Sequence, residues 1–303
     1  MDQNYCSIQT NVIAEKLKIQ RKYRGATMLS KEKLIQIKQL KETCEKEGGF
    51  ELKLNMDMLE NRDENSKEDF FHYEKEELVG FLGSYGFGNK IEMTGMVHPD
   101  YRRQGIFSKL FIMAVEETKQ QNIKTILLNA PNASQTAKKF LKNIPCTFSL
   151  SEYQMRWHQT NLYDDPAVTI RRSISQDDLE AEIQLEVACF GFSEQEAREF
   201  NKRMRELNSE DMYIIEAEGK TAGKIRVSET NGEAWIYGFA VFPELQGKGI
   251  GRKALSKAVK KENEKGLPVF LEVEAKNAHA LKLYESCGFK SYHSQDYYLY
   301  LGL

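Results

Sequence analysis

The strongest constraint on the fold of this chain is an internal repeat. The segments VHPDYRRQGI (residues 97–106) and VFPELQGKGI (residues 241–250) share Val, Pro, Gly and Ile in one register, at an offset of 144 residues. The register continues without a gap through Lys109 and Lys253, Ala114 and Ala258, Val115 and Val259, Leu127 and Leu271, and Lys138 and Lys282. A length of 303 residues also favours two domains of about 150 residues each. The sequence therefore predicts two copies of one fold.

Composition narrows the class of protein. A hydrophobic share of 41% and a charged share of 29% are typical of a globular protein, and a formal charge of −2 argues against a broad cationic surface for nucleic acid. The chain has no run of about 18 apolar residues and no signal-like start. The cysteines Cys6, Cys44, Cys146, Cys189 and Cys287 lie far apart, without zinc-ligand spacing. We expect a cytoplasmic protein with reduced thiols, no metal, and neither nucleic acid nor membrane as a partner.

Both copies show the same expected order of elements. In the second copy we expect a strand at 167–172, one or two helices between 177 and 208, a three-strand meander at 211–242, a helix from 247 that stops at Gly266, a strand at 268–275, a short helix at 278–287 and a strand at 291–301. In the first copy we expect a helical start within 1–50, a loop at 63–69, strands at 70–88 and 91–97, a helix at 105–121, a strand at 125–130, a helix at 134–142 and a strand at 147–157. A linker begins at Trp157, with Pro166 near the boundary, which predicts domains 1–161 and 162–303.

A glycine-rich strand-to-helix junction in the second copy predicts a phosphate site. The spacing Gln246-x-x-Gly249-x-Gly251 lets successive backbone N–H groups at a helix start face one anion, and Lys248 and Arg252 add positive charge. The segment lacks the GK[ST] ending of a nucleotide P-loop and the glycine spacing of a dinucleotide fold. A glycine-rich turn into an ordinary helix is the alternative interpretation.

A second group of polar residues follows this junction. Asn277 and Tyr284 are seven residues apart, or two helical turns, so both can project from one helix face. In the strand LEVEA, alternation places Glu272 on the side opposite Leu271. A carboxylate, an amide and a phenol can therefore converge at one end of the sheet.

Together, VFPELQGKGIG, LEVEAKN and NAHALKLYESCGF resemble the GNAT superfamily of acetyl-CoA-dependent N-acetyltransferases, from near Ala167 to residue 303. The resemblance implies two tandem GNAT folds of the α/β (α+β) class, each a mixed, mostly antiparallel twisted sheet flanked by helices. It implies acetyl-CoA as cosubstrate and direct attack by an amine. Domain 162–303 would be catalytic, and domain 1–161 would be degenerate.

The resemblance also implies roles for individual residues. The backbone of Phe239, Ala240 and Val241 would line the pantetheine arm, and Gln246, Gly247, Lys248, Gly249, Ile250, Gly251 and Arg252 would surround the pyrophosphate. Asn277 would bind the pantetheine, and Tyr284 would be the general acid. Glu272 matches the catalytic glutamate of the ribosomal-protein alanine N-acetyltransferases, and a base is needed because a protonated amine has no lone pair for attack.

The identity of the general base is open, because the second copy contains other candidates. Glu274, Glu233 and Glu229 are alternative bases. His279 and His293 fit surface positions better than catalytic ones, and Cys287 fits core packing.

The first copy keeps part of this pattern. Arg102-x-x-Gly105 retains the front of the junction, but Phe107 replaces the last glycine. A second CoA site would use Gly95, Met96, Val97, Arg103, Gln104, Gly105, Ile106, Phe107 and Ser108. At the registers of Glu272 and Tyr284 stand Leu128 and Phe140, or Leu141 after a one-residue slip, and none of these moves a proton. Mycothiol synthases are a precedent within the resemblance for two such domains with one productive site.

Two classes of function follow. The first is an N-acetyltransferase that acts on a primary amine of a small molecule or peptide. The alternative is a non-catalytic, CoA-responsive binding module, which would not need the set Glu272, Asn277 and Tyr284. The acidic residues Glu64, Glu68, Asp69, Glu74, Glu76 and Glu77 either form a solvated loop or attract a cationic acceptor. Monomer and homodimer both remain open.

Overall fold

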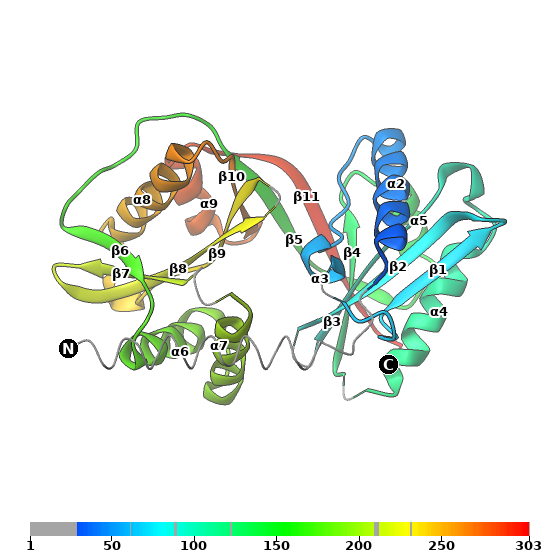
Figure 1. Ribbon diagram of the computed structural model, residues 1–303, viewed down its shortest axis with the longest axis horizontal. Coiled ribbons are helices and arrows are strands. Elements are labelled where there is room, and N and C mark those ends of the chain that lie inside the picture. Colours follow the sequence, from blue (N-terminus) through cyan, green and yellow to red (C-terminus); the bar gives the residue numbers. More distant parts are fainter. Residues whose placement is uncertain are drawn as a thin grey trace. The chain divides into compact units, whose positions relative to one another are not determined.

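The computed structural model describes residues 29–60, 62–87, 90–121, 123–208, 212–230 and 232–302. Cys6 and the first part of the expected helical start lie outside these residues. The chain divides into two compact units, Met1–Ser151 with His293–Leu303, and Glu152–Tyr292. Each unit has its own set of strands and helices (Figure 1) and its own hydrophobic core.

The first unit is a mixed sheet with helices on both faces. Its elements are α2 (Lys31–Gly48), α3 (Met56–Glu60), β1 (Asp69–Glu74), β2 (Glu77–Phe87), β3 (Lys90–Val97), the 3-10 turn η1 (Pro99–Tyr101), α4 (Ile106–Lys119), β4 (Thr125–Pro131) and α5 (Gln135–Leu141). The strand order is β1-β2-β3-β4, with β3 and β4 parallel and the other pairs antiparallel. One core lies between the sheet and α4, and a second core lies beneath α2 on the opposite face.

The second unit repeats this plan. Its elements are β6 (Val168–Arg172), α6 (Gln176–Phe190), α7 (Glu194–Asn208), β7 (Met212–Ala217), β8 (Lys220–Thr230), β9 (Glu233–Val241), the 3-10 turn η2 (Pro243–Leu245), α8 (Ile250–Glu264), β10 (Val269–Glu274) and α9 (Ala278–Ser286). The strand order is β10-β9-β8-β7-β6, and β9 and β10 are parallel. Helices α8 and α9 cover the face that holds the core, and α6 and α7 lie on the opposite face (Figure 1). The predicted order of elements is confirmed in the second copy. Over the described residues of the first copy it also holds, except that the stretch 70–88 is a hairpin of β1 and β2 and that α3 was not predicted.

Each sheet is completed by a strand from the other half of the sequence. Strand β11 (Phe289–Tyr300) pairs through Gln295–Leu299 with β4 of the first unit. Strand β5 (Cys146–Trp157) pairs through Glu152–Arg156 with β10 of the second unit. The compact units therefore differ from the expected division at residue 161. The two strands follow equivalent short helices, and their residue pattern does not specify which sheet each one joins.

The segment predicted as a linker is attached to the second unit. Lys257 and Lys260 on α8 donate to the two carboxylate oxygens of Asp164, each at 2.8 Å. Lys253 lies 2.6 Å from Asp165. Both carboxylates are exposed to solvent, so these ion pairs add little to stability.

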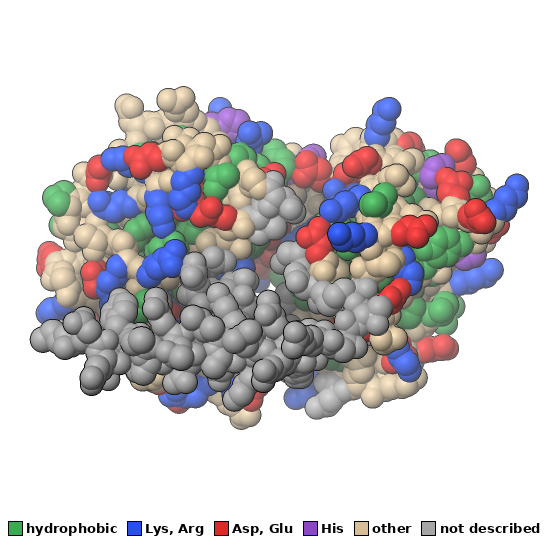
Figure 2. All heavy atoms as spheres, in the orientation of Figure 1, with side chains coloured by type: hydrophobic (Ala, Val, Ile, Leu, Met, Phe, Trp, Pro, Cys, Tyr) green, Lys and Arg blue, Asp and Glu red, His purple; other side chains and the backbone are tan. Residues whose placement is uncertain are grey.

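Charges of both signs are mixed over the described surface. Figure 2 shows Lys and Arg side chains interspersed with Asp and Glu on the visible face of each unit. Among the described residues, no helix combines the length and the apolar character needed to cross a bilayer.

Candidate active site

The second unit has an opening between two parallel strands. Strands β9 and β10 pair through Ala234–Ile236 and Val269–Leu271. Beyond Leu271, β10 continues along its other edge with β5. Beyond Ile236 and Leu271 the two strands no longer pair with each other, and we call the place where they part the opening.

A bulge in β9 lies at this opening. Lys224 of β8 is opposite Ala240, but Arg226 is opposite Tyr237, so Gly238 and Phe239 together face one residue of β8. Gly238 has a φ of 53°, which favours glycine. A bulge leaves a backbone group outside the ladder. This geometry suits the role expected for the backbone of Phe239 and Ala240.

The glycine-rich junction forms an anion-binding geometry at the start of α8. Gly247 and Gly249 have φ values of 76° and 77°, and Gly249 is the N-cap of α8. Gln246 holds the loop against β9, because its Nε2 donates to the carbonyl oxygen of Val241 at 2.9 Å. The backbone N–H groups of the first turn of α8 remain as donors for an anion.

Side chains around this junction add charge and shape. Lys248 is exposed, and the Arg252 guanidinium lies 5.3 Å from the centre of the Tyr163 ring. Ile250 is buried in the core and anchors the helix start. A Cβ at Gly251 would lie 3.4 Å from Phe239, so a larger residue there would press on the Phe239 ring.

Tyr284 lies on α9 at the covered face of the same opening. Its side chain is 9% exposed, and its ring centre is 6.4 Å from that of Phe239. Burial raises the pKa of Tyr284 to about 12, so the phenol stays neutral at ordinary pH. The described residues provide no hydrogen-bond partner for its hydroxyl, whereas buried core tyrosines usually have one.

Glu272 lies on the other face of the sheet. Its neighbours in β10, Leu271 and Val273, are in the core beneath α8, so alternation directs Glu272 to the face on which α6 and α7 lie. Gln154 of β5 donates from Nε2 to Glu272 Oε1 at 3.0 Å. This contact of Gln154 with a predicted site residue was missed from the sequence, because the strand of Gln154 was assigned to the first domain.

The other carboxylates considered as bases have local partners. Glu229 forms an ion pair with Lys265, and the hydrogen bond from that lysine lowers the pKa of Glu229. Glu233 accepts from Trp235 Nε1 at 2.9 Å. Glu274 lies 2.6 Å from Lys276 Nζ.

The remaining candidates lie at distinct places in the fold. Asn277 is the N-cap of α9 rather than a residue within it, and its Oδ1 accepts from the N–H of Ala280 at 3.1 Å. His279 is exposed. His293 belongs to the first unit, where its Nε2 lies 3.3 Å from Glu51 Oε1. Cys287 is buried in the core of the second unit, and burial raises the pKa of its thiol.

The first unit keeps the backbone of the anion-binding junction. Arg103 and Gly105 have φ values of 67° and 80°, close to those of Gly247 and Gly249. Arg102 Nε donates to the carbonyl oxygen of Val97 at 3.1 Å, which is the contact that Gln246 makes in the second unit. Gln104 and Ser108 are exposed beside this loop, and Ile106 is buried.

The opening itself is filled in the first unit. The pairing of β2 with β3 has no register shift, so β3 lacks the bulge of β9. Thr94 Oγ1 donates to Asn129 Oδ1 at 3.1 Å, across the position where β3 and β4 part. The Phe107 ring lies against Gly95 and packs on Phe140 with ring centres 4.8 Å apart.

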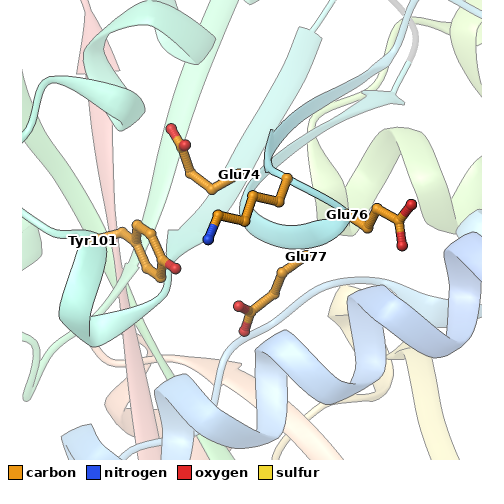
Figure 3. Close-up of a pocket in the computed structure, with 5 residues that line it drawn as sticks. Glu74, Glu76, Glu77 and Tyr101 are labelled. Carbon is orange, nitrogen blue, oxygen red and sulfur yellow. The ribbon is translucent and has the colours of Figure 1, made fainter.

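The acidic stretch of the first unit lines a separate pocket. Glu74, Lys75, Glu76, Glu77 and Tyr101 surround about 570 Å³ at the turn between β1 and β2. In Figure 3, Glu76 points away from Tyr101, while Glu74 and Glu77 lie nearer to it. None of the predicted catalytic residues lines this pocket.

Comparisons with known proteins show the family and the fold of the chain. The model of the acetyltransferase (GNAT) family matches residues 34–143 and 179–289. A mycothiol acetyltransferase from Saccharomonospora viridis is 25% identical over 71% of this chain and 77% of its own length. A [ribosomal protein bS18]-alanine N-acetyltransferase from Salmonella typhimurium is 33% identical over 38% of this chain and 77% of its own length. The crystal structure of a GCN5-related N-acetyltransferase from Sphaerobacter thermophilus, at 17% identity, has a TM-score of 0.74 and covers 90% of this chain and 94% of that one. The chain therefore belongs to the GNAT family of N-acetyltransferases and carries two domains of that fold.

Proposed function

We propose that the second unit binds acetyl-CoA and transfers its acetyl group to a primary amine of a small molecule or peptide, and that the first unit does not catalyse. The observation that carries the proposal is the position of Glu272 and Tyr284. They lie on opposite faces of one sheet, beside the opening between β9 and β10. An acid and a base on opposite sides of a thioester are what amine attack and thiol departure require.

The junction at α8 supports binding of the cosubstrate, since acetyl-CoA carries a pyrophosphate and is used by this family. Backbone donors from Gly247 to Arg252 would hold the pyrophosphate, with Lys248 and Arg252 supplying positive charge. The bulge at Gly238 and Phe239 would hold the pantetheine arm and the acetyl carbonyl through backbone groups. With Oδ1 engaged as a helix cap, Asn277 would bind the pantetheine through its remaining amide N–H groups.

The two catalytic side chains divide the proton transfers. Glu272, held by Gln154, accepts the proton that the ammonium form of the acceptor must lose before its nitrogen can attack. Tyr284 donates a hydrogen bond and then a proton to the departing sulfur. Its raised pKa keeps the phenolic proton available over the whole neutral range.

The relatives support an amine acceptor without naming it for this chain. One relative is a mycothiol acetyltransferase, and another acetylates an alanine of a ribosomal protein. A second candidate function, CoA-responsive binding without turnover, is favoured by one observation in the first unit. There the loop at Arg103 and Gly105 keeps this backbone conformation, while Leu128 and Phe140 stand at the registers of Glu272 and Tyr284.

Thiol release from acetyl-CoA over a panel of amines tests the proposal. Tyr284→Phe should lower kcat by about 100-fold or more while the Kd for CoA stays within about threefold. Tyr213→Phe is the matched control, because it removes a hydroxyl of the same unit that contacts Lys261 instead of the opening. Normal turnover in Tyr284→Phe would refute the acid assignment. Tight acetyl-CoA binding without acceptor-dependent release across the panel would favour the binding module.

A further inference from the structure

The face of the second unit that carries Glu272 also carries several cations, and three of them have acidic partners. Lys224 is buried and forms an ion pair with Glu186. Arg205 lies 3.1 Å from Glu182. Arg171 forms two ion pairs: its Nη2 lies 2.7 Å from Asp178 Oδ1, and its Nε lies 2.7 Å from Glu216 Oε1. Compensation of this kind is expected where charges are removed from water.

Not every cation on this face has such a partner: among the described residues, Arg156, which is exposed over the Phe270 ring, lacks one, and so does Arg226. Arg226 is half-buried on β8, and among the described residues no carboxylate lies within 4.0 Å of its guanidinium. Its Nη1 donates to the sulfur of Met204 at 3.5 Å, and its Cζ lies 4.6 Å from the centre of the Tyr237 ring. Its Nε is buried and has no hydrogen-bond partner.

A guanidinium in this position is arranged to bind a planar anion. The Tyr237 ring restricts the orientation of the guanidinium. The thioether of Met204 is a weak acceptor and does not compensate the charge. A carboxylate matches the N–H edge of arginine with two parallel hydrogen bonds.

Strand register places Arg226 near the proposed base. Arg226 is directly opposite Tyr237 in the pairing of β8 with β9. Tyr237 follows Ile236, which pairs with Leu271, and Glu272 follows Leu271. The backbones of Arg226 and Glu272 are thus two strand spacings apart, about 10 Å, and both side chains lie on one face. The same face therefore presents a carboxylate at one point and an uncompensated cation at another.

Resting on the proposed function, we infer that Arg226 binds a carboxylate of the acceptor, so that the substrate is an amino acid or another amine that carries a carboxylate. Glu272 receives the ammonium end and Arg226 the carboxylate end. On β2 of the first unit, Gly83 and Ser84 lie at the corresponding register, opposite Thr94 and Met93, and neither carries a charge. Arg226 is in this sense a specificity-determining residue of the second unit.

Matched acceptor pairs test the inference. The probes are glycine, β-alanine, γ-aminobutyrate and L-phenylalanine, each beside its carboxamide, which keeps the amine and removes the negative charge. We expect at least one acid to exceed its amide in kcat/KM by about 10-fold or more. Arg226→Gln should reduce that ratio to near one by slowing the acid alone. Arg226→Lys should keep part of the preference, because the charge remains but the paired donors are lost.

Arg198→Gln is the control, because Arg198 lies on the exposed side of α7 and pairs with Glu180 and Glu194. It should leave every ratio unchanged. The inference would be overturned if Arg226→Gln lowered kcat/KM equally for an acid and its amide. It would also be overturned if the wild type preferred no acid over its amide.

Calorimetry in the presence of CoA separates this inference from the proposed function. If the acids bind the wild type but not Arg226→Gln, and no amine is acetylated, the carboxylate site stands and the enzymatic proposal fails. Absence of acid binding to the wild type refutes the carboxylate site, whatever the turnover.

Discussion

The two units share a loop backbone but differ in what surrounds it. Arg103 and Gly105 adopt the same left-handed conformations as Gly247 and Gly249, and Arg102 and Gln246 make the same contact with the end of the preceding strand. Glycine is therefore not required for this loop to form, since Arg103 accepts a positive φ. The comparison shows that this loop backbone can persist where the place at which the two parallel strands part is filled.

Much of the difference around the loop comes from the position of one aromatic residue, which lies on the strand in one unit and on the helix in the other. In the second unit the ring comes from the strand, as Phe239, and the helix start has Gly251. In the first unit the ring comes from the helix, as Phe107, and the strand has Gly95. Both arrangements fill the junction between strand and helix. In the second unit a bulge accompanies the strand aromatic, whereas the strand of the first unit pairs regularly.

The two units also differ in whether the hydroxyls of their buried tyrosines have hydrogen-bond partners. In the first unit, the Tyr85 hydroxyl donates to the carbonyl oxygen of Leu54 at 2.5 Å, and the Tyr297 hydroxyl accepts from Lys53 at 2.9 Å. These hydroxyls are used for stability. The hydroxyl of Tyr284 has no such partner among the described residues, as expected for the acid that we propose.

The largest effect is expected from removing the charge of Glu272, the residue whose register is occupied by the uncharged Leu128 in the first unit. Glu272→Gln should lower kcat/KM for the best acceptor by about 100-fold, because the amine then loses its proton to water. Steady-state thiol release measures this change, with Glu274→Gln as the neighbouring control on the same strand face. A large loss in Glu274→Gln with little loss in Glu272→Gln would transfer the base to Glu274.

Moving the aromatic residue to the helix start should weaken cosubstrate binding. In Gly251→Phe the new Cβ would lie 3.4 Å from Phe239 and 3.5 Å from Leu283, so the ring must displace one of them. We expect the Kd for acetyl-CoA to rise about 10-fold or more, as calorimetry would show. Phe107→Leu, at the equivalent position of the first unit, should leave that Kd unchanged. A rise in Phe107→Leu would show that the first unit takes part in binding.

The pH dependence should distinguish Tyr284 from an ordinary phenol. Because burial raises its pKa to about 12, the proton is retained below that pH, and activity should show no Tyr284-dependent fall between pH 7 and about 10.5. The pH profiles of the wild type and Tyr284→Phe, compared over that range, measure the effect. A fall centred near pH 10 that disappears in the variant would mean that the phenol is exposed to water.

The smallest effect is expected at Arg103, where a glycine would copy Gly247. Arg103→Gly relieves a φ of 67° but gives the unfolded chain more freedom, so the free energy of unfolding should change by about 1 kcal/mol or less. Denaturant unfolding measures it. A loss well above about 1 kcal/mol would show that the Arg103 side chain itself supports the loop.

Local sequence patterns predicted most helices and strands, but they did not predict which distant strands pair with each other. The end of α8 at Gly266 and of α9 at Gly288 followed from glycine, and both have positive φ. The bulge at Gly238 was missed because a single glycine in a strand does not specify the partner register. Gln154 was missed for a related reason, since its contact with Glu272 depends on which sheet β5 joins. Arg226 could be recognised as unusual only after the partners of its neighbours were known.

The exchange of β5 and β11 bears on how the protein is made. During synthesis the ribosome delivers β4 long before β11, so the first sheet has an unpaired edge until the second unit has emerged. The second sheet, in contrast, finds β5 already translated when β10 appears. Cutting the gene near codon 161 would consequently yield two fragments that each lack a strand, and coexpression of both pieces would be needed to restore either sheet.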